Sequence, residues 1–158
     1  MKPGVRAVIA LGCNVGDCAS TLDAARRAIR ALPDVTVLGA VADERTAAVS
    51  EMLQPDYLNG MLVVRTSLAP AALLAALHAI EAAHGRTRPE RHAPRTLDLD
   101  LVWIEGVTSD DPALVLPHPA FVARPWLRTH LAALVGAGVT ASAIDAIHAR
   151  AVADPRDV

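Results

Sequence analysis

The chain has 158 residues, of which 53% are hydrophobic and 20% are charged, and its formal net charge at pH 7 is −2. A chain of this length can bury one hydrophobic core without disulfides or a structural metal, so we expect a single domain over residues 1–158. The weak net charge excludes a general attraction to nucleic acid or to an anionic membrane surface, and the apolar runs are shorter than the about 20 residues of a membrane helix.

The N-terminal part predicts a strand, a loop and a helix. Residues 5–11 are rich in β-branched side chains, and residues 12–16 then supply turn-forming glycine and asparagine. Asp17 is a candidate N-cap for a helix that Pro33 ends. No export cleavage site follows the basic start, so we expect a cytoplasmic protein, and we expect it to be a monomer.

The next segments predict two strands and a second helix. Residues 35–49 are extended and lead into a polar stretch, and Tyr57–Arg65 reads as a strand. Pro70 opens a helix whose apolar residues recur at helical spacing until Gly85. Residues 85–94 carry three arginines and two prolines, which is typical of a surface loop.

The remaining sequence predicts one long strand and a helical end. Residues 95–105 alternate as a strand, residues 106–111 predict a turn, and residues 113–116 predict a short strand. Two helices are expected over 126–134 and 140–150. The order β-α-β-β-α-β predicts an α+β, ferredoxin-like core with an antiparallel sheet and a C-terminal helical extension.

Two cysteines, Cys13 and Cys18, lie five residues apart in the expected first loop. Their spacing matches neither a CxxC redox pair nor a four-ligand zinc pattern. We therefore expect ordinary thiols in a reducing cytosol.

Asp98 and Asp100 are the most informative pair. Side chains at positions i and i+2 of a strand lie on one face about 7 Å apart, so two carboxylates there repel unless a cation lies between them. Carboxylate pairs bind Mg²⁺ readily when phosphate oxygens complete its coordination. A solvated strand face that carries two aspartates is the alternative.

Four arginines come just before this pair. Guanidinium groups bind phosphate oxygens bidentately and stay charged, which favours a triphosphate site over a solvated loop. The chain has no GxxxxGK[ST] motif, so a Walker loop is excluded. The four residues are Arg86, Arg88, Arg91 and Arg95.

Residues 91–102, RHAPRTLDLDLV, resemble the signature of the hydroxymethyldihydropterin pyrophosphokinase family. LGCN near the N-terminus, QPDYLN at 54–59, IEAAHGRTR and LPHP at 116–119 resemble further segments of that family. The resemblance implies transfer of a diphosphoryl group from ATP to 6-hydroxymethyl-7,8-dihydropterin, with release of AMP, in folate biosynthesis. No nucleic-acid or membrane partner is implied.

The resemblance also implies residue roles. Asp98 and Asp100 would hold two Mg²⁺ ions and, with Arg86 and Arg95, form the catalytic group. The residues implied to bind ATP are Arg86, Arg88, Arg91, Arg95, His118 and Arg124. The residues implied to hold the pterin are Thr46, Tyr57, Asn59, Glu81 and Trp126, with the two aromatic rings stacking on its faces.

Each of these residues also has an ordinary structural interpretation. Tyr57 and Trp126 can be core aromatics, Asn59 a strand-edge amide, His118 a rigid corner and Glu81 a solvated surface charge.

Other functions also stay open, namely another Mg-dependent phosphoryl or nucleotidyl transferase, or a noncatalytic ferredoxin-like binding module. His92 stands where the best-known relatives have tryptophan, which leaves nucleotide affinity open and is the sole basis for a pseudoenzyme.

Overall fold

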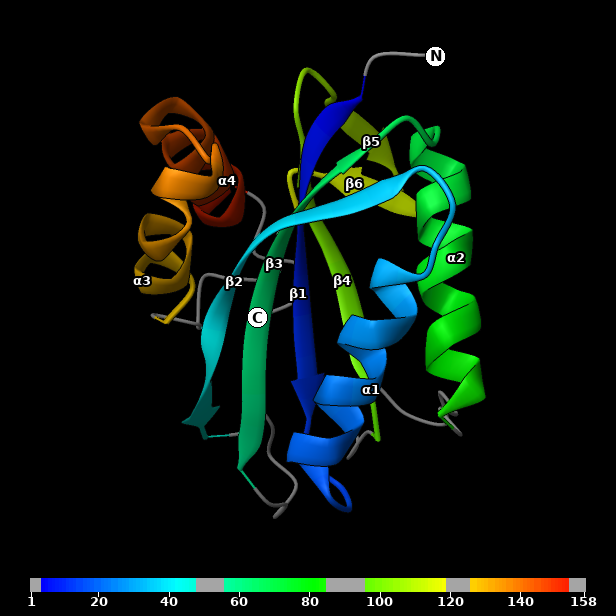
Figure 1. The fold of residues 1–158 in the computed structure, drawn as a ribbon. Coiled ribbons are helices and arrows are strands. Elements are labelled where there is room, and N and C mark those ends of the chain that lie inside the picture. Colours follow the sequence, from blue (N-terminus) through cyan, green and yellow to red (C-terminus); the bar gives the residue numbers. More distant parts are fainter. Residues whose placement is uncertain (1–3, 48–55, 85–95, 119–125, 154–158) are drawn as a thin grey trace.

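Figure 1 shows a computed structural model of the chain, in which helices lie on both sides of one sheet. The structure describes residues 4–47, 56–84, 96–118 and 126–153. Within these ranges no helix is both long and apolar enough to cross a membrane. The elements in chain order are β1 (Val5–Cys13), α1 (Cys18–Arg30), β2 (Val35–Thr46), β3 (Tyr57–Thr66), α2 (Pro70–Ala83), β4 (Asp98–Ile104), β5 (Ser109–Asp111), β6 (Leu114–Leu116), α3 (Trp126–Ala133), a 3₁₀ turn (Val135–Ala137) and α4 (Ala141–Ala153).

The main sheet has the strand order β2-β3-β1-β4, and every neighbouring pair is antiparallel. β1 is therefore central, with β3 on one side and β4 on the other. This order, with α1 and α2 as the connections and two further helices after β4, confirms the predicted α+β, ferredoxin-like fold with a helical extension.

The β5–β6 hairpin corrects part of the prediction of a turn over residues 106–111. A turn does lie at residues 105 and 106, where Gly106 has φ of +73°. Ser109–Asp111 is instead a strand that pairs with Leu114–Leu116, so the hairpin turn lies at residues 112 and 113. The carboxylate of Asp111 accepts a hydrogen bond from the backbone N–H of Ala113 at 2.9 Å, which closes that turn. A three-residue strand made of polar residues has no hydrophobic alternation, so the sequence pattern could not reveal it.

Alternate side chains of β1 enter two separate hydrophobic clusters. Ala7, Ile9 and Leu11 pack with residues of α1 and α2, whereas Val8 and Ala10 pack with residues of α3 and α4. Figure 1 shows the two helix pairs on opposite sides of the sheet. Because full burial of a large aliphatic side chain stabilises by about 1.5–3 kcal/mol, both faces of the central strand contribute to holding the fold.

The two connecting helices begin where the sequence predicts. The side chain of Asp17 caps α1 by accepting the backbone N–H of Ser20 at 3.2 Å, and Pro70 is the first residue of α2. The apolar face of α1 is buried in the cluster beneath it through Leu22, Ala25 and Ile29.

A disulfide joins the end of β1 to the start of α1. Cys13 and Cys18 are bonded, with their Cα atoms 5.4 Å apart. The expectation of two ordinary thiols is therefore wrong. The sequence spacing alone could not show the pairing, because it depends on how the chain turns between the two residues.

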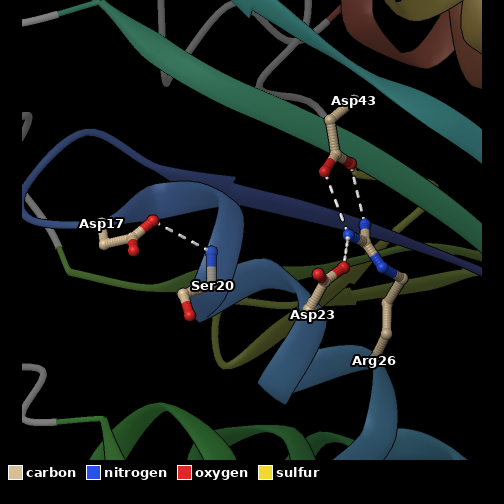
Figure 2. A network of polar contacts seen from close by, with 5 residues as sticks. All are labelled: Asp17, Ser20, Asp23, Arg26 and Asp43. Carbon is tan, nitrogen blue, oxygen red and sulfur yellow. Dashed lines mark hydrogen bonds and ion pairs between the residues drawn. The ribbon is translucent and has the colours of Figure 1, made fainter.

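A charged network ties α1 to β2 (Figure 2). The guanidinium of Arg26 donates to both carboxylate oxygens of Asp43, at 2.8 and 3.0 Å, and to Asp23 at 2.7 Å. The side chains of Arg26 and Asp43 are only 14% and 19% exposed, whereas that of Asp23 is 61% exposed. The hydrogen bond to Asp43 raises the pKa of Arg26, and the hydrogen bond from Arg26 lowers the pKa of Asp23.

Gly60 makes this network possible. A Cβ at that position would lie 2.5 Å from Oδ1 of Asp43 and 3.2 Å from Nη1 of Arg26. The pairing of β2 with β3 also shifts register between Val41 and Glu44, the segment that contains Asp43. The network therefore braces an irregular part of β2 across the bare backbone of β3.

We expect Asp43→Ala to lower the free energy of unfolding by about 1–3 kcal/mol, because it leaves a largely buried guanidinium with one carboxylate instead of two. Urea denaturation at pH 7 measures the change. Asp23→Ala is the matched control and should have a smaller effect, because its carboxylate is mostly in water. An equal loss in the two variants would contradict the bracing role.

The contribution of Asp23 to stability depends on pH. The pKa of Asp23 is lowered from 3.8, so its contribution to stability is present above that pH and is lost as the pH falls through the folded-state value.

Candidate functional site

The strand register gathers most of the described candidate residues at one end of one sheet face. Across the four strands, Glu44 pairs with Asn59, Asn59 with Gly12, and Gly12 with Asp98. Thr46 pairs with Tyr57 one step further along. We call this set, together with Asp100, the site row.

The site row lies on the same face as the α3–α4 cluster. In β4, Leu99 and Leu101 belong to the α1–α2 cluster, as does Leu97 just before the strand, and Val102 belongs to the other cluster. Because side chains alternate along a strand, Asp98 and Asp100 point to the face that Val102 occupies. The predicted shared face of the two aspartates is confirmed, and both are partly exposed.

Gly12 forms the floor between the aromatic and acidic parts of the site row. The sequence assigns it to a turn, but the structure places it inside β1, so that assignment is wrong. A Cβ there would lie 3.3 Å from Oδ1 of Asn59 and 3.4 Å from Cδ1 of Tyr57. Glycine thus lets the ring and the amide approach the backbone of β1, and its position in the LGCN segment was the available signal.

Asn59 links β3 to β2 at the edge of the site. Its side chain is only 6% exposed, and its Nδ2 donates a hydrogen bond to the hydroxyl of Thr46. The alternative of a strand-edge amide does not hold, because β3 is an inner strand. This hydrogen bond orients the amide beside the partly buried Tyr57.

His118 lies beside the acidic pair. Its Nε2 is 3.8 Å from Oδ1 of Asp100, and its backbone N–H donates to the carbonyl of Val102 at 2.8 Å. It follows a cis peptide bond between Leu116 and Pro117. The two interpretations of His118, a rigid corner and a residue that binds ATP, are therefore compatible, because the corner brings its imidazole beside the carboxylate of Asp100.

Glu81 supports β4 from the helix side. It is 2% exposed, and its Oε2 accepts a hydrogen bond from the backbone N–H of Leu99 at 2.8 Å. The alternative of a solvated surface charge is wrong. A signal for this was present, since Glu81 follows the buried Leu77 by four residues and so falls on the buried face of α2.

Leu99 stands between Asp98 and Asp100. A hydrogen bond to its backbone therefore holds the edge strand at the point from which both carboxylates project.

His130 is a residue to which sequence reasoning assigns no role. It is buried in α3, and its Nε2 lies 2.8 Å from Oε2 of Glu44 in the site row. This contact fixes α3 against the end of β2. Trp126, the first residue of α3, precedes His130 by one helical turn.

Several predicted residues cannot be placed. Arg86, Arg88, Arg91, Arg95 and Arg124 lie outside the described residues, as does His92. The backbone of Trp126 is described, but its side chain is not. The predicted polar stretch over 50–55 and the predicted surface loop over 85–94 also lie outside the described residues.

The carboxylates of Asp98 and Asp100 supply only some of the ligands that a hard divalent cation needs. In the described ranges, no group of three or more His, Cys, Asp and Glu side chains could hold a metal ion. Two partly exposed carboxylates on one strand face do fit Mg²⁺, which is usually held by one or two carboxylates while phosphate oxygens and water fill its other positions.

The sequence is similar to those of known proteins over most of its length. The family model described as 7,8-dihydro-6-hydroxymethylpterin-pyrophosphokinase matches residues 8–136, a span from β1 to the 3₁₀ turn. The 2-amino-4-hydroxy-6-hydroxymethyldihydropteridine pyrophosphokinase of Methylorubrum extorquens is 38% identical over 127 residues, which are 80% of this chain and 80% of the relative.

Two proteins of the same name from Pseudomonas are also similar. That of Pseudomonas putida is 40% identical over 116 residues, 72% of this chain and 94% of the relative. That of Pseudomonas aeruginosa is 36% identical over 129 residues, 82% of this chain and 80% of the relative. The match of the family model over residues 8–136, with these similarities over most of each chain, shows that the chain belongs to the 7,8-dihydro-6-hydroxymethylpterin-pyrophosphokinase family.

Proposed function

We propose that this chain transfers the diphosphoryl group of ATP to the hydroxymethyl group of 6-hydroxymethyl-7,8-dihydropterin, releasing AMP, as a step of folate biosynthesis. The observation that carries the proposal is the register of β1, which sets Asp98 beside Gly12 and Gly12 beside Asn59 on one face. An acidic pair suited to a metal-bound triphosphate thus adjoins the ring of Tyr57 and the amide of Asn59, which both lie beside Gly12. We place the pterin there and call these three residues the ring slot.

The ring end of the site row is suited to a flat heterocycle. We assign Tyr57 and Trp126 to stacking on the two faces of the pterin, and Asn59 to hydrogen bonds with its edge. Thr46 would hold the Asn59 amide in place through the hydrogen bond described above. A sugar or protein acceptor would have less use for this pairing of aromatic rings and a buried amide.

The acidic end is suited to the nucleotide phosphates. We assign Asp98 and Asp100 to binding two Mg²⁺ ions, which would neutralise phosphate charge when bound. We assign Arg86 and Arg95 to the triphosphate and the leaving group. The remaining residues that we assign to the nucleotide are Arg88, Arg91, His118 and Arg124.

The diphosphoryl group passes directly from ATP to the pterin, without a covalent enzyme intermediate. The pterin hydroxyl oxygen forms a bond to the β-phosphorus, the bond from that phosphorus to the oxygen shared with the α-phosphate breaks, and AMP leaves with the electron pair. The hydroxyl proton is released to water. Such transfers depend mainly on positioning and on neutralising charge, which fits a site built from fixed carboxylates and guanidinium groups.

We also propose a cytoplasmic location, because ATP is an intracellular co-substrate. Cell fractionation with an antibody to this chain tests it, and recovery in the membrane or extracellular fraction would contradict it.

The proposed reaction predicts that the purified protein, given Mg²⁺, ATP and the pterin alcohol, produces AMP and the pterin diphosphate in equal amounts. Asp98→Ala and Asp100→Ala should each lower kcat by about 10²-fold or more, because each removes charge stabilisation that the transfer needs. Chromatography of the nucleotides measures both results.

Asp110→Ala is the matched control, since this carboxylate is exposed on the separate hairpin. It should keep full activity. Accumulation of ADP in place of AMP would refute diphosphoryl transfer, and full activity of both aspartate variants would remove the metal assignment.

Glu81→Ala should destabilise the protein by about 1–3 kcal/mol, because it leaves the buried N–H of Leu99 without its acceptor. It should also lower kcat/KM, since β4 then loses its support between the two aspartates. Glu81→Gln keeps an amide oxygen as acceptor and should recover most of both losses. Equal damage in the two variants would show that the negative charge itself, and not the hydrogen bond, is needed.

Gly12→Ala should weaken pterin binding by about tenfold, because the added methyl group approaches both Tyr57 and Asn59. Affinity for an ATP analogue should change much less. Isothermal titration with each ligand separates the two effects, and equal weakening of both would argue against Gly12 as the floor of the ring slot.

A further inference from the structure

The bond between Cys13 and Cys18 lies directly behind the ring slot. Cys13 is the last residue of β1 and follows Gly12, the floor of the slot. It pairs with Leu58 of β3, which stands between Tyr57 and Asn59. A change in the position of Cys13 therefore reaches both residues that we assign to the pterin.

The two sulfur atoms differ in accessibility. Cys13 is fully buried within the cluster under α1 and α2, whereas Cys18 is only partly buried against it. Cys18 is also the first residue of the 13-residue α1, where the positive end of the helix dipole favours a thiolate. Cys18 is thus the sulfur that an external reagent meets first.

The loop between the two cysteines supplies a hydrogen-bond acceptor for the reduced state. The carbonyl oxygen of Val15 lies 3.4 Å from Sγ of Cys13 and 3.8 Å from Sγ of Cys18. In the reduced protein this oxygen can accept a hydrogen bond from either thiol. Gly16, with φ of +83° and no atom within 4 Å of an added Cβ, lets the connecting loop turn without crowding.

The short separation argues against a mainly structural bond. A disulfide stabilises chiefly by restricting the unfolded chain, and this effect grows with the length of the closed loop. Here the two cysteines are only five residues apart. In addition, the protein has two extensive hydrophobic clusters, and one of them contains neither cysteine.

We propose that Cys13 and Cys18 form a reversible oxidation site for low-molecular-weight thiols and disulfides, and that its oxidised state holds the ring slot in its binding geometry. The second half of this statement rests on the proposed function, whereas the first half does not. Because the bond adds a covalent link between the end of β1 and α1, its reduction should loosen this part of the site and weaken pterin binding.

The thiol–disulfide exchange proceeds in two steps. The Cys18 thiolate attacks one sulfur of a small disulfide such as oxidised glutathione, forms a mixed disulfide and releases one small thiolate, which takes up a proton. The Cys13 thiolate then attacks the Cys18 sulfur, forms the internal bond and releases the second small thiolate. Two protein thiols are oxidised, one small disulfide is reduced, and reduction follows the reverse order.

The first test measures the site without any activity. The native protein is equilibrated with mixtures of reduced and oxidised glutathione, quenched with acid, unfolded and alkylated in denaturant, and analysed by mass spectrometry. We expect the number of alkylated thiols per chain to change reversibly, from two in reducing mixtures to none in oxidising mixtures. Cys13→Ser should accumulate a glutathione adduct on Cys18, whereas Cys18→Ser should remain unmodified at the buried Cys13.

The second test measures pterin and ATP-analogue affinities in the two states. Reduction should raise the Kd for the pterin about fivefold or more in the wild-type protein, with a smaller change for the nucleotide. Cys18→Ser changes a partly exposed side chain and should match the reduced wild type in every redox mixture.

The outcomes separate the two proposals. Two alkylated thiols at every glutathione ratio, or a bond that resists reduction in the folded protein, would overturn the oxidation site while leaving the pyrophosphokinase activity standing. Equal pterin affinity in both states would overturn the coupling. Reversible oxidation in a protein that neither binds pterin nor forms AMP would instead overturn the proposed function.

Discussion

β1 forms backbone hydrogen bonds along both of its edges, and the register of these two ladders is the constraint on which the rest of the structure depends. A shift by one residue would turn every side chain of a strand to the opposite face. Asp98 would then point into the cluster under α1 and α2, and Leu99 would leave it. The pairing of Leu11 with Leu99, both buried, holds the register in which the acidic pair reaches the face of the site row.

Charged groups with little solvent contact hold the two edge strands of the sheet. On β4, Glu81 accepts the backbone N–H of Leu99, and on β2, Asp43 is held by Arg26 from α1. Edge strands have a neighbour on one side only, so the backbone ladder constrains them less than it constrains β1 and β3. Each of these carboxylates places a strong hydrogen bond near a segment that carries site residues. Contacts on the opposite face of the sheet therefore contribute to the precision of the site, together with those on its own face.

The final two residues of β1 point to opposite faces of the sheet. Gly12 is turned toward the ring slot, and the next side chain, Cys13, is turned into the cluster under the connecting helices. Because neighbouring residues of a strand share one stiff backbone, a covalent link on one face can influence the other. This is the physical basis for coupling a thiol reaction to ligand binding without any direct contact between sulfur and ligand.

Local patterns were sufficient to predict most of the helices and strands, because periodicity, capping and turn residues act over a few positions. Asp17, Pro70 and the alternation around Asp98 mark their elements where the structure has them, and the shared face of the two aspartates follows from strand geometry alone. The hairpin strand Ser109–Asp111 was missed, because so short a polar strand exists only through its partner.

What the sequence by itself determined was thus the order of elements, the fold class and the acidic pair. The tertiary structure alone decided the hydrogen bond from Leu99 to Glu81, the place of His118 beside Asp100 and the bond between the cysteines. Each of these depends on which distant segments lie side by side, and that is set by strand register and by packing across the sheet rather than by neighbours along the chain.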